Sequence, residues 1–110
     1  MSSGGFSAPP RGAGGIVDDN VCSSLVFVTK VANADEDLID DLNEGMLLDV
    51  SLVIENGVES VAILFRDQVL GGIMSHGVQL KSCLSNDFEF EAIVLSVSMG
   101  IITIKIQPRK

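Results

Sequence analysis

A histidine, a serine and a cysteine lie within nine positions of one another, and side chains of these types can perform nucleophilic catalysis. His76 is the single histidine of the chain, Ser75 directly precedes it, and Cys83 follows. A histidine can activate a thiol for hydrolysis, but the nucleophile needs a lowered pKa and the base needs an orienting third group. No motif here supplies either. A small hydrolase that uses a Cys/His pair is therefore an alternative, and a protein that is not an enzyme is the main expectation.

Neither a metal site nor a cofactor site is predicted. With two cysteines and one histidine, the four ligands of a structural zinc site require carboxylates or a second chain. The acidic run that begins at Asp35 departs from the calcium-loop pattern, because Ile39 and Met46 occupy the fifth and twelfth positions. The glycines of "GAGG" lack the strand and helix that flank a phosphate-binding loop.

The two cysteines are predicted to be reduced and buried. Small secreted domains that depend on disulfides usually have more cysteines at closer spacing, and Cys22 and Cys83 both have apolar neighbours. A free cysteine in such surroundings behaves as a small hydrophobe. The amino terminus lacks the apolar region of a secretory signal, and the apolar runs are much shorter than the roughly 20 residues that span a bilayer. The expectation is a cytoplasmic protein that does not enter a membrane.

The charge of the chain is strongly and unevenly negative. Its formal net charge is −8, and nine acidic residues lie between Asp18 and Asp49, where Lys30 is the single basic residue. This field disfavours nucleic acid as a partner, because sequence-independent affinity for phosphates comes from Lys and Arg. An acidic segment can be a solvated surface or a docking site for a basic protein. The candidate docking residues are Asp37, Asp40 and Asp41.

Composition divides the chain into a tail and one domain. The first fifteen residues include five Gly, two Pro and three Ser, a composition that cannot bury enough apolar area to order itself. We expect a flexible tail over residues 1–20 and a domain over residues 21–110. Within the tail, Phe6 is a candidate anchor for a partner surface.

Alternating apolar residues predict strands through most of the domain. A strand is expected from about Val21, followed by a short amphipathic helix that is capped by Asn33 or Asp35 and ends before Gly45. Two further strands should form a hairpin at Asn56-Gly57, which is the strongest short-range signal for a type I′ turn. A second turn is expected at residues 66–68.

The second half of the domain is expected to contain three more strands and a helical turn or two. Gly71 and Gly72 suggest a bulge or a close backbone approach within the next strand, and residues 75–84 permit a short helix. In residues 88–106 the apolar face changes parity, which predicts a bulge in a long bent hairpin that turns at Met99-Gly100. The fold class is mainly β: a small SH3-like or OB-like β-barrel of five or six strands with one or two short helices. An open sheet buried on both faces is the alternative.

The stretch "VAILFRDQVLGGIMSHGVQLKSCLSNDFEFEAIVLSVSMGIITIKI", from Val61 to Ile106, resembles the later part of a HIRAN domain. The shared order is a strand and turn, a strand that carries a glycine, a short helix, and a final hairpin. The resemblance implies a small barrel that recognises DNA ends as an accessory module of helicases and nucleases. Arg66, Gly71 and His76 are the residues it carries over.

The sequence thus predicts a non-enzymatic protein-binding or assembly module, an accessory subunit of a larger complex. A protein partner or a second copy of the chain would use exposed strand edges or the acidic helix. The second alternative is a HIRAN-like module that binds nucleic-acid ends, for which Arg66, Gly71, His76 and Lys81 are the candidate binding residues.

Overall fold

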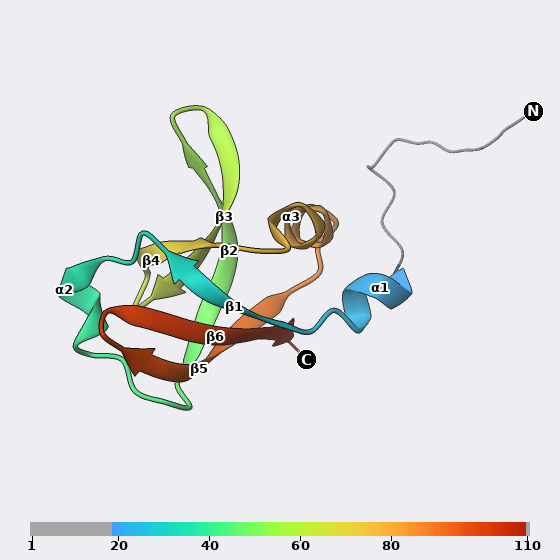
Figure 1. Ribbon diagram of the computed structural model, residues 1–110. Coiled ribbons are helices and arrows are strands. Elements are labelled where there is room, and N and C mark those ends of the chain that lie inside the picture. The colour runs from blue at the N-terminus through green and yellow to red at the C-terminus, as the bar shows by residue number, and fades with distance from the viewer. Residues whose placement is uncertain (1–18, 110) are drawn as a thin grey trace, which may run out of the picture.

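The computed structural model describes residues 19–109, which form six strands and three short helices. The strands are antiparallel to their neighbours, and the helices lie around the sheet (Figure 1). In chain order the elements are α1 (Asp19–Ser23), β1 (Phe27–Ala32), α2 (Glu36–Ile39), β2 (Leu47–Glu55), β3 (Val58–Phe65), β4 (Gln68–Ile73), α3 (Gly77–Ser85), β5 (Phe90–Ser98) and β6 (Ile101–Pro108). The prediction of a mainly β fold is confirmed.

Strand pairing runs in a closed ring. The order is β1-β4-β3-β2-β5-β6, and β6 pairs again with β1. The weakest link is between β1 and β4, where two residue pairs are formed, Val31 with Ile73 and Ala32 with Gly72. The β2–β3 hairpin extends beyond the residues of β2 that pair with β5 and the residues of β3 that pair with β4. Its end therefore projects from the ring (Figure 1).

The three predicted tight turns are confirmed. Asn56 and Gly57 have φ of 52° and 77° and join β2 to β3, as a type I′ turn requires. Positive φ is also found at Arg66 and Asp67, between β3 and β4, and at the Met99-Gly100 turn between β5 and β6. These turns place consecutive strands side by side, which fixes most of the ring.

The parity change in the carboxyl-terminal hairpin is resolved by a bulge, as predicted. The register of β5 against β6 shifts between Val94 and Ser96. Before the bulge, Phe90, Ala92 and Val94 are buried. After it, Val97 packs on the core instead of lying outside. One extra residue therefore lets a bent strand contribute both parities to one core.

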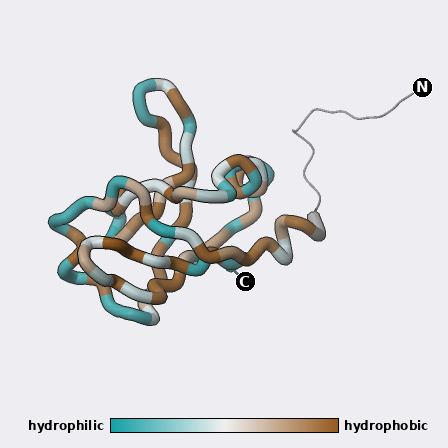
Figure 2. Tube along the Cα trace, in the orientation of Figure 1, coloured by the Kyte–Doolittle hydropathy of each residue, from teal (hydrophilic) through white to brown (hydrophobic). Residues whose placement is uncertain are grey.

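The core fills the inside of the ring. Ile102, Ile104 and Ile106 of β6 are fully buried and meet side chains from every other strand, together with Leu80 and Cys83 of α3. Thr29 on β1 is the buried polar residue of this interior among residues 19–109. Apolar segments alternate with polar ones along the trace, and the tip of the projecting β2–β3 hairpin is polar (Figure 2).

Two local predictions at the amino-terminal side are wrong. The chain at Val21 forms helix α1, and β1 begins only at Phe27. The acidic helix α2 is capped by the Asp35 side chain, as predicted, but it has four residues, so Gly45 lies beyond it. Gly45 has φ of 89° in the loop before β2, where its N–H donates to the carbonyl of Val94. Tertiary contact, and not helix capping, explains that glycine.

Candidate functional site

A cavity of about 670 Å³ lies where β3 and β4 separate and α3 passes beside them. This volume falls within the range of roughly 300–1,000 Å³ that is usual for ligand sites. One wall is the β2–β3 hairpin and the other is the first turns of α3, with β4 between them. We call this cavity the β3 groove. Its lining residues are Ala32, Asn33, Asp35, Val53, Glu55, Glu59, Ser60, Val61, Ala62, Val69, Leu70, Gly71, Gly72, Ile73, Gly77, Val78 and Lys81.

The groove exists because β4 changes partner at its glycine pair. Gly71 pairs with Ile63 of β3 across a bulge, whereas Gly72 pairs with Ala32 of β1. The chain crosses β1 so closely that a Cβ on Gly71 would lie 2.5 Å from the Ala32 carbonyl oxygen. Only glycine fits there. The predicted close backbone approach is therefore confirmed at Gly71, and it leaves the first half of β3 without β4.

The freed half of β3 presents unpaired backbone groups. Since a two-residue turn closes the β2–β3 hairpin with a hydrogen-bonded pair, alternate residues of β3 point their N–H and C=O away from β2. Along the strand these residues are Glu59, Val61, Ile63 and Phe65. The last two pair with β4, but within residues 19–109 neither Glu59 nor Val61 has a strand partner on that side.

This edge opens progressively toward the hairpin turn. Val61 is 9% exposed, and its carbonyl oxygen would lie 3.7 Å from a Cβ on Gly72, so β3 and β4 still touch there. Glu59 is exposed. The accessible outward backbone groups of this edge are therefore those of Glu59, on the projecting hairpin.

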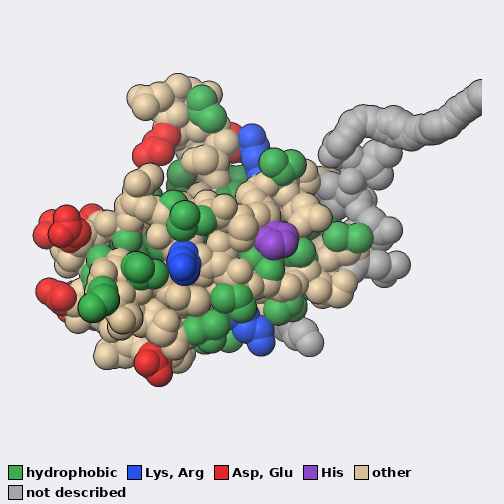
Figure 3. All heavy atoms as spheres, viewed as in Figure 1, with side chains coloured by type: hydrophobic (Ala, Val, Ile, Leu, Met, Phe, Trp, Pro, Cys, Tyr) green, Lys and Arg blue, Asp and Glu red, His purple; other side chains and the backbone are tan. Residues whose placement is uncertain are grey.

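The groove combines apolar walls with an excess of carboxylates. Val53, Val69 and Val78 come from the hairpin, β4 and α3, and Val78 is 80% exposed. The charged residues of the lining are Asp35, Glu55, Glu59 and Lys81. Acidic side chains are prominent on the projecting hairpin and over α2 (Figure 3). The lining therefore favours a ligand with apolar and positively charged groups.

Two of the four predicted binding residues lie in the groove, namely Gly71 and Lys81. Arg66 does not join them. It precedes β4, whereas His76 follows it, and a strand of six residues separates them by roughly 20 Å. The Arg66 guanidinium lies 4.7 Å from the centre of the Phe65 ring and 3.6 Å from the Asp41 carboxylate.

His76 is occupied by contacts near the start of β1. It has φ of 61° at the start of α3, and its ring stacks on Phe27 with centroids 4.3 Å apart. Its Nδ1 lies 3.2 Å from the Ser75 hydroxyl, and that hydroxyl donates to the Thr29 hydroxyl. Phe27 is buried, so the histidine covers the aromatic edge of the core.

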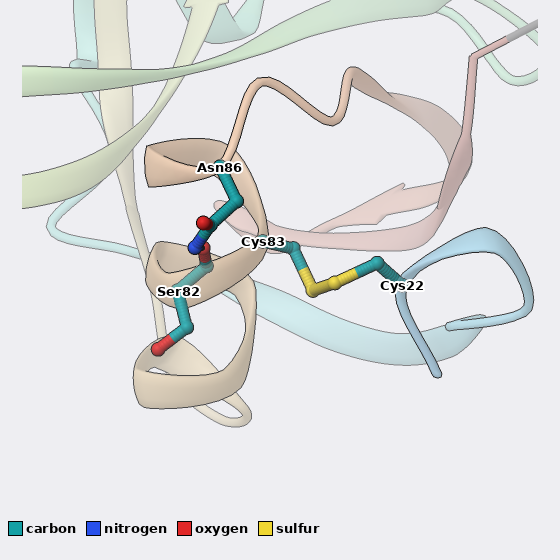
Figure 4. Close-up of a disulfide and its surroundings, with 4 residues drawn as sticks. All are labelled: Cys22, Ser82, Cys83 and Asn86. Atoms are coloured by element: carbon teal, nitrogen blue, oxygen red, sulfur yellow. Dashed lines mark hydrogen bonds between the residues drawn. A yellow bond between two sulfur atoms is a disulfide. The ribbon is translucent and has the colours of Figure 1, made fainter. Parts of the chain in front are cut away.

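The prediction that the cysteines are reduced is wrong, although both are buried. Cys22 of α1 and Cys83 of α3 form a disulfide (Figure 4), and they are 0% and 2% exposed. Spacing along the chain did not reveal this pair, because α1 and α3 meet only through the fold. Residues 19–109 therefore contain no free cysteine, and the thiol that the Cys/His alternative requires is absent from this oxidised form.

The predicted docking residues of the acidic segment lie at one place. Asp37 belongs to α2, and Asp40 and Asp41 follow it directly. All three are exposed, and Asp41 also contacts Arg66. Phe6 lies outside the described residues.

Sequence reasoning missed the acidic and apolar lining of the groove. Glu55, Glu59 and Val78 gave no signal as a set, because they come from three different elements. The available signal was indirect. The two strands predicted on either side of Asn56-Gly57 were longer than the predicted strand that contains Gly71 and Gly72. The second hairpin strand could therefore pair with that shorter strand over only part of its length.

Searches of the described residues found no cluster of three or more side chains that could hold a metal ion. None of the helices between residues 19 and 109 has the length and apolar character needed to cross a membrane. Comparisons of the chain with protein-family models, with curated proteins and with solved structures gave no match.

Proposed function

We propose that this chain is a non-enzymatic protein-binding module that accepts an extended segment of a partner as an added strand beside β3. The observation that carries the proposal is the partnerless first half of β3 next to a groove of suitable size. Added strands of this kind gain affinity from main-chain hydrogen bonds and specificity from pockets for alternate side chains. Such a module would serve as an accessory subunit of a larger complex.

The projecting hairpin has two such edges among residues 19–109, because β2 pairs with β5 only through Leu47, Leu48 and Asp49, and the edge of β3 is the one that borders the β3 groove. In a closed ring every strand has two neighbours, which supports the interpretation of the fold as a small SH3-like or OB-like barrel. Closure removes free edges, and natural proteins usually cover those that remain. The edge of β3 at Glu59 is not covered by another element, and the β3 groove lies beside it. A binding role explains why it is left open.

The two alternatives lack comparable support. A Cys/His hydrolase needs a thiolate, and the Cys83 sulfur is bonded to Cys22. A nucleic-acid-end binder of the HIRAN type would use Arg66 together with His76, which lie at opposite ends of β4. No observation favours either function over strand addition.

The proposal is tested by removing one outward N–H. Proline is tolerated at edge positions whose N–H points away from the ladder, and Glu59 occupies such a position. Glu59→Pro therefore removes the donor that an added strand needs, and Glu59→Gln is the matched control that removes the charge alone. The ligands are blocked heptapeptides that alternate valine with lysine, with serine or with glutamate, and binding is followed by NMR of the labelled protein.

The expected result is that at least one peptide shifts the amide signals of Glu59 and Val61, and that Glu59→Pro weakens its binding by about tenfold or more, as loss of a main-chain hydrogen bond in an edge pair implies. A melting temperature close to that of the parent shows that the variant is folded. Strand addition at β3 is excluded if no peptide moves these amides, or if Glu59→Pro binds as well as Glu59→Gln.

A further inference from the structure

The charges and the floor of the β3 groove indicate what kind of segment it takes. We infer that the ligand is an extended basic strand, whose lysine or arginine side chains are attracted by the groove carboxylates Glu55 and Glu59, on opposite faces of the hairpin, and which places an apolar side chain over Gly72. This inference rests on the proposed strand addition, and it specifies the chemistry of the partner.

The electrostatic part of the inference depends on carboxylates without basic partners. Among the described residues, the salt bridges involve Arg66 and Arg109, which contact Asp41, Asp49 and Glu91. Glu55 and Glu59 have no such partner and lie on the two strands of the hairpin. Lys81 on the opposite wall is the single cation of the groove. A basic ligand would be attracted by Glu55, Glu59 and the third carboxylate of the lining, Asp35, and repelled by Lys81.

Gly72 supplies the space for the apolar side chain. A Cβ on Gly72 would make one ordinary contact, 3.7 Å from the Val61 carbonyl oxygen, whereas a Cβ on the adjacent Gly71 would clash with the backbone of β1. Gly72 is thus not required by the fold. Its missing side chain leaves the floor open between Val69 and Val78, which line the groove on either side.

A second copy of this chain is a poor occupant of the same edge. If β3 paired with β3 of a second molecule about a twofold axis, the hairpins of the two copies, each with Glu59 on β3 and Glu55 on the adjacent β2, would lie side by side. Like charges on adjacent strands are destabilising. The net charge of −8 adds to this repulsion. A separate, basic partner satisfies the groove better than self-association does.

The charge assignment is tested with variants that should change affinity in opposite directions. The lysine–valine heptapeptide should bind more tightly than its serine–valine and glutamate–valine counterparts. The double change Glu55→Gln and Glu59→Gln should weaken binding of the lysine peptide about three- to tenfold, and Lys81→Gln should strengthen it about two- to threefold. Glu44→Gln, an exposed carboxylate outside the groove, is the control and should leave affinity unchanged.

The floor is tested with a graded series at one position. Gly72→Ala should weaken binding slightly, and Gly72→Leu should abolish it, with melting temperatures that show both variants to be folded. Equal binding of the three peptides, or a Lys81→Gln variant that binds the lysine peptide less tightly, would overturn the basic-strand assignment. If Glu59→Pro still removed binding, that result would leave strand addition itself intact. A dimer in sedimentation that Glu59→Pro dissociates would instead identify a second copy as the occupant and contradict the inference.

Discussion

Reduction of the Cys22–Cys83 disulfide is expected to lower the free energy of unfolding substantially. The bridge joins residues 61 positions apart, so it closes more than half of the chain into one loop. In the chain-entropy treatment, a loop of this length stabilises the folded state by about 4 kcal/mol, because the unfolded chain loses that much conformational freedom. The bridge ties α1, which has five residues, to α3.

The assay is urea unfolding of the oxidised and reduced protein, with the midpoint and the m-value measured separately. Reduction should lower the midpoint and raise the m-value, since an uncrosslinked chain exposes more surface on unfolding. Reduction leaves both thiols in place, and both sulfur positions are buried. The double variant Cys22→Ala/Cys83→Ala removes both the bridge and the buried sulfur atoms, so it adds the cost of a cavity to the loss of loop closure. It should be less stable than the reduced form by about 1 kcal/mol or more.

Two outcomes would refute this reasoning. Detection of two reactive thiols when protein kept under air is unfolded without reductant would mean that the bridge does not form. A change of less than about 1 kcal/mol in the free energy of unfolding on reduction would mean that the bridge contributes little to the constraint of the unfolded chain.

Three other predictions concern stability. Gly71→Ala should destabilise the fold by about 1–3 kcal/mol, because its Cβ would clash with the Ala32 carbonyl, and Gly77→Ala, where a Cβ meets nothing within 4 Å, is the control in the same thermal melts. Phe90→Ala should cost about 3–5 kcal/mol in urea unfolding, since the side chain is 1% exposed, and a cost below about 1 kcal/mol would contradict its place in the core. Arg66→Ala should change stability by less than about 1 kcal/mol, as its ion pair is exposed to solvent; a larger loss would show that the pair organises the α2 loop.

Much of the sheet could be predicted because its determinants are local. Asn56-Gly57 and Met99-Gly100 have the positive φ values that hairpin turns demand, and Asn-Gly in particular signals such a turn in a sequence. The parity change in residues 88–106 required a bulge, and one is present between Val94 and Ser96. Alternation and turn chemistry act over a few residues, so a single sequence displays them.

The features that failed to appear in the sequence depend on contacts between distant segments. The disulfide requires α1 to lie against α3, and neither spacing nor neighbouring residues encode that contact. The HIRAN resemblance grouped Arg66 with His76, but strand β4 separates them and Arg66 contacts Asp41. The glycine pair predicted a close approach without indicating that β4 would leave β3 for β1.

The candidate site could be predicted only in part, because its lining residues come from segments that are distant in the chain. Gly71 and Lys81 were selected from the sequence and both line the groove. The acidic wall was not, because Glu55 and Glu59 resemble ordinary exposed strand residues until the missing neighbour of β3 is known. A binding surface that consists of backbone groups has no side-chain signature.

Amide hydrogen exchange at Glu59 tests the central claim most directly. In the free protein this N–H points away from β2 and has no strand partner among residues 19–109, so it should exchange rapidly, in contrast to the amide of Ser60, which bonds within the hairpin. Saturation with the lysine–valine heptapeptide should slow exchange at Glu59 and leave Ser60 little changed. An amide at Glu59 that is already protected in the free protein, or that stays unprotected when the peptide is bound, would contradict the account.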